Sequence, residues 1–161
     1  MAFEIKKIGV IGAGQMGRGI AHVCAVAGYD VFLLDLNEAA LKAAMDSIKH
    51  GMERRAARNE ITKDDVAKAM KRIATGTDYG IFKGCQLVIE AATEDEQVKK
   101  EILKTLCKSL PADALIASNT SSISITRLGA QTDRPGKFVG MHFMNPVPRM
   151  ELVELIRGIA T

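Results

Sequence analysis

The sequence predicts an α/β fold: a doubly wound, mostly parallel sheet with helices on both faces and a helical-pair insertion after the second strand. Short apolar runs alternate with helix-like stretches along the chain. The runs at 31–34 and 87–92 show little polar alternation, as in strands that are buried on both faces. A glycine-rich segment joins the first apolar run, residues 5–11, to the first helical stretch. A sheet of this kind binds ligands at the carboxyl ends of its strands.

The elements follow in order from their periodicity and their stop signals. The first helix ends at Gly28, and Pro111 stops the helix after the third strand. The long helical region after the second strand is broken near Asn59 and resumes at Thr62, an N-cap residue followed by acids. We expect strands at 5–11, 30–35, 87–92, 114–118, 137–143 and 151–156, and helices at 15–27, about 38–72, 95–110 and 124–128.

Length and composition describe an ordinary globular domain. The chain has 161 residues, 47% of them hydrophobic and 25% charged, which suffices for one domain with its own core. A net charge of +3 is too small and too dispersed to indicate a nucleic-acid partner. No apolar run approaches the roughly 20 residues that span a bilayer, and the N-terminus lacks the layout of a signal peptide. We therefore expect a cytoplasmic protein with no membrane partner.

The glycine-rich segment predicts a dinucleotide site of the Rossmann type. Gly12 allows a tight turn from strand to helix, Gly14 lets the backbone approach a pyrophosphate, and Gly17 lets the helix pack closely. The free N–H groups at the start of the helix suit the phosphates. The residues expected to bind the cofactor here are Gly12, Ala13, Gly14, Gln15, Met16 and Gly17.

Asp35 selects among dinucleotides. It closes the second apolar run 18 residues after Gly17, where a carboxylate can accept hydrogen bonds from the ribose hydroxyls. The same carboxylate would repel a 2′-phosphate. The predicted cofactor is therefore NAD rather than NADP.

No metal site is predicted. The three cysteines, Cys24, Cys85 and Cys107, are far apart, and their spacing resembles neither a zinc site nor a redox pair. We expect them to be small buried hydrophobic residues.

Polar side chains gather after the later strands. Ser121 follows the strand at 114–118, His142 lies at the end of the strand at 137–143, and Glu154 lies in the last strand. Alcohol oxidation needs a base, an acid that orients the base and a donor that holds the oxygen, and histidine suits the first role near neutral pH. A histidine at a strand end is also often structural, so the chemistry alone leaves both interpretations open.

At this point the chain resembles the L-3-hydroxyacyl-CoA dehydrogenases, above all the bacterial 3-hydroxybutyryl-CoA dehydrogenases. Four motifs carry the resemblance in fixed order along almost the whole chain: GAGQMG at 12–17, VIEAATE at 88–94, ASNTSS at 117–122 and GMHFMNP at 140–146. The resemblance implies an NAD-dependent oxidoreductase that interconverts (S)-3-hydroxyacyl-CoA and 3-ketoacyl-CoA. It also implies that the helical pair at 38–72 projects toward the acyl-CoA.

The resemblance also assigns roles to individual residues. It implies that His142 is the catalytic base, that Glu154 is its carboxylate partner, and that Ser121 holds the substrate oxygen beside the nicotinamide. It places Glu94, Lys99 and Asn145 on the nicotinamide-ribose side, with Asn145 also near the substrate. Arg58 matches a basic position that contacts CoA, whereas Gly51 stands where some relatives offer a serine. From the residues alone, the basic stretch around Arg58 is read first as a solvated helix face, which is the default for charged residues on surface helices.

Members of the family are nearly twice as long and continue into a helical domain that closes over the substrate and forms the dimer. We therefore expect residues 1–161 to form an NAD-binding domain that stops before its last helix and strand, with that helical domain absent and with a homodimer in the full-length form. As an isolated chain it is expected to bind NAD with little turnover. A dehydrogenase of a sugar acid or another hydroxy acid is the other alternative. Val153, Leu155 and Ile156 are expected to be exposed.

Overall fold

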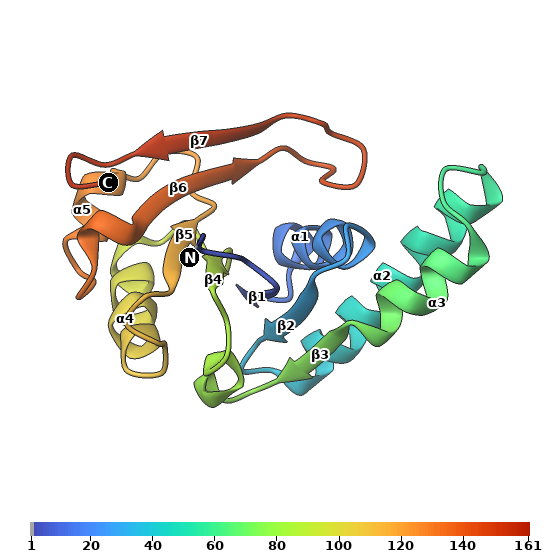
Figure 1. Ribbon diagram of the computed structural model, residues 1–161, viewed down its shortest axis with the longest axis horizontal. Coiled ribbons are helices and arrows are strands. Elements are labelled where there is room, and N and C mark those ends of the chain that lie inside the picture. The colour runs from blue at the N-terminus through green and yellow to red at the C-terminus, as the bar shows by residue number, and fades with distance from the viewer. Residues whose placement is uncertain (1) are drawn as a thin grey trace.

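The computed structural model describes residues 2–161 and contains one seven-stranded sheet (Figure 1). The strand order is β3-β2-β1-β4-β5-β6-β7, and all neighbours are parallel except β6 and β7. The strands are β1 (Lys7–Ile11), β2 (Asp30–Leu34), β3 (Ile73–Gly76), β4 (Leu87–Glu90), β5 (Leu115–Ser118), β6 (Phe138–Phe143) and β7 (Val153–Arg157). The predicted doubly wound, mostly parallel sheet is confirmed.

Five α-helices accompany the sheet. They are α1 (Gln15–Val26), α2 (Glu38–Ala57), α3 (Lys63–Lys71), α4 (Glu96–Cys107) and α5 (Ile125–Gly129), with 3-10 turns η1 (Tyr79–Phe82) and η2 (Pro135–Lys137). Buried side chains form two hydrophobic clusters, one between the sheet and α1, α2 and α3, the other between the sheet and η1, α4 and α5. Successive residues of β1 point to opposite clusters, Val10 to the first and Ile11 to the second, as a strand covered on both faces requires.

The helical pair α2 and α3 is the insertion predicted after the second strand. Figure 1 shows it reaching away from the sheet, with its turn at the far end. Asn59 adopts a positive φ of 59° at that turn, which breaks the helix where the sequence predicts it. Thr62 caps α3 through a reciprocal pair of hydrogen bonds with Asp65, of 2.8 and 3.0 Å. The pair therefore has a well-defined geometry.

The strand β3 is not among the strands predicted from the sequence. This strand has four residues, of which only Ile73 is buried, and it follows α3 after a single residue. It is held by parallel pairing with β2 rather than by local propensity. The sheet thus gains an edge strand that connects the helical pair to the core.

The strand β7 is exposed along its whole length. All five of its residues are exposed, and Val153, Leu155 and Ile156 are 37, 67 and 39% exposed, as predicted. Apolar surface of this extent at a sheet edge favours association. We expect the 161-residue chain to self-associate in light scattering, and the triple variant with lysine at these three positions to be a monomer. A monodisperse wild-type monomer would contradict this.

Candidate active site

The glycine turn has the geometry that the sequence predicts. Gly12 has a φ of +103°, and a Cβ there would lie 2.6 Å from the Ala91 carbonyl oxygen. A Cβ on Gly17 would lie 1.6 Å from the Gly12 carbonyl oxygen, so the first turn of α1 packs directly on the glycine turn. A Cβ on Gly14 would meet nothing within 4 Å. The space beside Gly14 is therefore open to a ligand.

The start of α1 offers hydrogen-bond donors to that space. Gly14 caps the helix without a side chain, and the first intrahelical bond runs from the Arg18 amide to the Gly14 carbonyl at 3.0 Å. The amide groups of Gln15, Met16 and Gly17 therefore have no acceptor within the helix. Such amides and the helix dipole suit a pyrophosphate. This arrangement fits a dinucleotide.

Asp35 lies just beyond the carboxyl end of β2, next to the glycine turn. One carboxylate oxygen accepts from the Ala13 amide and the other from the Asn37 amide, each at 2.9 Å. Each oxygen has a second lone pair, so the carboxylate can still accept from ribose hydroxyls. Asp35 is thus an oriented carboxylate at the position where the sequence predicts the residue that selects NAD.

A cavity of about 190 Å³ lies beside the glycine turn. It is lined by Met16, Ala91, Ala92, Thr93, Glu94, Lys99 and Asn119. Glu94 accepts a hydrogen bond from the Thr120 hydroxyl at 3.0 Å, which fixes its carboxylate. Two of the three residues assigned by resemblance to the nicotinamide-ribose side, Glu94 and Lys99, therefore line this cavity, which we call the cofactor cavity.

One lining residue of the cofactor cavity, Lys99, belongs to a buried ion pair. The Lys99 ammonium lies 2.6 Å from Glu90 Oε1, and both side chains are at most 1% exposed. Ser118 donates to the same oxygen at 2.7 Å, and Glu90 Oε2 accepts from the Ala92 amide at 2.9 Å. The pair therefore ties β4, α4 and β5 together beneath the cavity. Glu90 is the one polar residue in its predicted strand, yet no role was predicted for it.

Removing the carboxylate of this pair should destabilise the fold. In Glu90→Gln the Lys99 charge stays buried without a counter-charge, so we expect the free energy of unfolding to fall by about 3 kcal/mol. Urea denaturation measures it. The double variant Glu90→Gln with Lys99→Met should recover most of the loss, and Asp64→Asn, which breaks the exposed pair with Lys68, should change little. An unchanged midpoint in Glu90→Gln would contradict the role.

The predicted base and its carboxylate meet across the last two strands. His142 and Glu154 are register partners in β6 and β7, and His142 Nδ1 lies 2.9 Å from Glu154 Oε2. The side chains are 23 and 50% exposed. His142 lies at the carboxyl end of β6, on the edge of the sheet that also carries the glycine turn. Asn119 bridges β5 to this end, because its Oδ1 accepts from the Phe143 amide at 2.8 Å.

Ser121 lies in the loop that follows β5, between β5 and α5, with its side chain exposed. Thr120 shapes this loop, since its Oγ1 accepts from the amides of Ser122 and Ile123 at 3.3 and 3.0 Å. The Ser121 hydroxyl is therefore available to a ligand at the same edge of the sheet.

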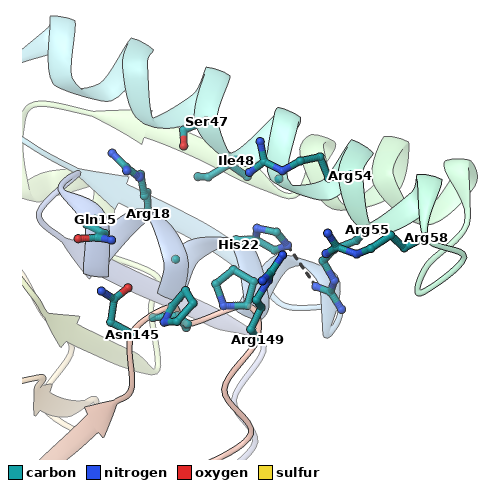
Figure 2. Close-up of a pocket in the computed structure, with 15 residues that line it drawn as sticks. Gln15, Arg18, His22, Ser47, Ile48, Arg54, Arg55, Arg58, Asn145 and Arg149 are labelled. Carbon is teal, nitrogen blue, oxygen red and sulfur yellow. Dashed lines mark hydrogen bonds between the residues drawn. The ribbon is translucent and has the colours of Figure 1, made fainter.

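A second cavity, of about 200 Å³, lies between α1, α2 and the segment after β6 (Figure 2). We call it the arginine pocket; its charged lining residues are Arg18, Arg54, Arg55, Arg58 and Arg149, and no acid is among its lining residues. Glu60 nearby pairs with Arg58 at 2.8 Å and with Arg55 at 3.3 Å. Such a site attracts anions, phosphates above all.

Three predicted residues, Gln15, Arg58 and Asn145, line the arginine pocket. Asn145 was assigned by resemblance both to the ribose side and to the substrate, and the structure places it here rather than among the residues of the cofactor cavity. Sequence analysis did not single out Arg18, His22 or Arg149, which come to the pocket from α1 and from the loop after β6. Single charged residues outside a motif give little signal of a shared site.

The structure adds two findings on metals and membranes. Within residues 2–161, no group of three or more histidine, cysteine or acidic side chains is arranged to hold a metal ion. None of the helices in this described part has the length and apolar character needed to cross a membrane.

Comparisons with known proteins agree with this geometry. Residues 7–161 match the family described as "3-hydroxyacyl-CoA dehydrogenase, NAD binding domain". The 3-hydroxybutyryl-CoA dehydrogenase of Bradyrhizobium diazoefficiens is 55% identical over all of this chain, and a probable 3-hydroxybutyryl-CoA dehydrogenase of Bacillus subtilis is 44% identical over 98% of it. The match covers 55% of each relative's length.

A solved structure is also similar to this chain. The (S)-3-hydroxybutyryl-CoA dehydrogenase from Ralstonia eutropha superposes with a TM-score of 0.96 and 46% identity, over 98% of this chain and 56% of that one. The fold, the glycine turn and the sequence thus lead to one assignment. The chain belongs to the 3-hydroxyacyl-CoA dehydrogenase family, of which it forms the NAD-binding domain.

Proposed function

We propose that this chain is the N-terminal domain of an enzyme that oxidises a short-chain (S)-3-hydroxyacyl-CoA, such as 3-hydroxybutyryl-CoA, to the 3-ketoacyl-CoA, or catalyses the reverse reduction. The observation that carries the proposal is the 2.9 Å contact of His142 with Glu154, on the same edge of the sheet as the glycine turn. The relatives from Bradyrhizobium diazoefficiens and Ralstonia eutropha, which match all or nearly all of the chain, are named for 3-hydroxybutyryl-CoA, which supports the substrate.

The proton goes to His142. Its Nδ1 is bonded to Glu154, so Nε2 is the nitrogen that takes the proton of the substrate hydroxyl. The Glu154 carboxylate orients the ring and stabilises the imidazolium that forms. The Ser121 hydroxyl donates to the substrate oxygen. NAD held by the turn at 12–17 and by Asp35 would supply the acceptor for the hydride of C3, so that the alcohol loses a proton and a hydride and becomes the ketone.

The remaining predicted residues divide between two ligands. We assign NAD to the turn at 12–17, to Asp35 and to Glu94 and Lys99 in the cofactor cavity. The CoA part of the substrate is assigned to the arginine pocket, where Arg58 and Asn145 lie. The full-length enzyme is proposed to be a cytoplasmic homodimer without nucleic-acid or membrane partners.

The 161 residues alone are proposed to bind NAD with little turnover. Half of the Glu154 side chain is exposed and β7 is uncovered, so the isolated chain does not exclude water from the His142 edge. Calorimetry with NADH and an absorbance assay with acetoacetyl-CoA test this. We expect NADH binding with slow oxidation, and fast oxidation only after fusion to the C-terminal part of the Bradyrhizobium relative. A fusion that binds both ligands without oxidising NADH would refute the proposed reaction.

A further inference from the structure

His22 is a buried histidine that lines the arginine pocket. It lies on α1, is 3% exposed, and has no part in the reaction described above. A Cβ on Gly51 of α2 would lie 3.4 Å from both Cε1 and Nδ1 of the ring. The imidazole therefore lies beside Gly51, between α1 and α2.

The ring has a defined tautomer. Arg55 NH1 lies 3.1 Å from His22 Nε2, and since a guanidinium only donates, Nε2 accepts (Figure 2). Burial, followed by the charges of Arg55 and Arg54, lowers the pKa of His22 to about 4. At neutral pH the ring is therefore uncharged, and its single proton is on Nδ1.

Within residues 2–161 that proton has no acceptor on the protein. Among residues 2–161 no group bonds to His22 Nδ1, yet no buried side-chain nitrogen or oxygen in this part of the chain lacks a partner. The nitrogen is therefore not sealed in the interior, and the ring faces the cavity that it lines. The Nδ1–H group of His22 is thus an oriented donor in a pocket that also holds five guanidinium groups.

We propose that His22 is a ligand-contacting residue whose Nδ1–H donates to a phosphate oxygen of the CoA moiety in the arginine pocket. The proposal rests on the proposed function, because CoA is the phosphate-bearing part of that substrate. Arg55 orients the donor from the other side of the ring. A neutral N–H adds direction to the contact without a further positive charge beside Arg54 and Arg55.

Calorimetric titration of the 161-residue protein with CoA tests the contact. His22→Leu should weaken CoA binding roughly tenfold or more, as expected for a lost hydrogen bond to a charged group. His22→Gln should stay within about threefold of wild type, because the amide can accept from Arg55 and donate to phosphate. His50→Leu is the matched control, since His50 is exposed on α2 and bonds only to its own helix at the Asp46 carbonyl. NADH affinity and circular dichroism report folding.

Nitrogen-15 NMR of the wild-type imidazole separates a direct contact from a structural role. We expect the free protein to show the Nδ1–H tautomer at neutral pH, and the Nδ1 resonance to shift when CoA is added. Because this measurement uses the wild-type protein, it tests the proposal even if a variant fails to fold. Dephospho-CoA locates the partner: a His22→Leu effect that vanishes with it indicates the 3′-phosphate, and one that persists indicates the diphosphate. Either result supports the proposal.

The failures are distinguishable. Wild-type protein that binds NADH but not CoA would refute the assignment of CoA to the arginine pocket, and the contact with it. Wild-type protein that binds CoA while His22→Leu binds equally well, or while the Nδ1 resonance stays unmoved, would overturn the role of His22 alone.

Discussion

Replacing His142 with glutamine in the fusion to the Bradyrhizobium C-terminal part should lower kcat about 10³- to 10⁴-fold. Glutamine keeps a polar side chain beside Glu154 but cannot take the hydroxyl proton. His142 is not among the residues that line the cofactor cavity, so the affinity for NADH should be unchanged. Steady-state assays in both directions and NADH titration by fluorescence measure the two quantities.

Two further variants make this result specific. Glu154→Gln should lower kcat less than His142→Gln, because the base remains and only its orientation and charge balance are lost. His50→Gln should behave as wild type, since His50 lies exposed on α2. If His142→Gln retained wild-type kcat, the assignment of the base would be wrong.

Gly14→Ala should weaken NADH binding strongly while leaving the protein folded. The methyl group meets no protein atom within 4 Å, so the free energy of unfolding should hardly change. It would occupy the space that the proposed pyrophosphate needs beside the start of α1. We expect the dissociation constant for NADH to rise at least about tenfold. Calorimetry and thermal unfolding on the same sample separate the two effects.

Gly17→Ala is the matched comparison in the same turn. Its methyl group would lie 1.6 Å from the Gly12 carbonyl oxygen, so the backbone must move. This variant should lose both stability and NADH binding. If Gly14→Ala bound NADH like wild type, the pyrophosphate would not lie beside Gly14. If Gly17→Ala kept wild-type stability, the close contact with Gly12 would not matter to the fold.

Much of the fold is predictable because its signals are local. The glycine turn, the break at Asn59 and the cap at Thr62 each depend on a few adjacent residues. Strand ends differed from prediction by one or two residues, as at β1, which starts at Lys7. The strand β3 could not be predicted, because its formation depends on pairing with β2 and not on its own sequence.

The site residues likewise differ in how far they could be predicted from the sequence. His142 and Glu154 could be placed at one edge because both lie at strand positions whose pairing follows from the topology. Glu90 gave a signal, a lone carboxylate in an apolar strand, but its partner Lys99 comes from the following helix. The arginine pocket left less signal in the sequence. His22 is a single polar residue on the buried side of α1, and Arg55 and Arg149, which line the same pocket, are distant in sequence.

The most direct test of the central claim is a crystal structure of the fusion carrying Ser121→Ala, with NADH and acetoacetyl-CoA bound. The predicted result places His142 Nε2 within about 3.2 Å of the 3-oxygen of the substrate, with Nδ1 still bonded to Glu154. The account would be contradicted by a structure in which the substrate is bound beside the nicotinamide, His142 Nε2 points away from the 3-oxygen, and another group contacts that oxygen.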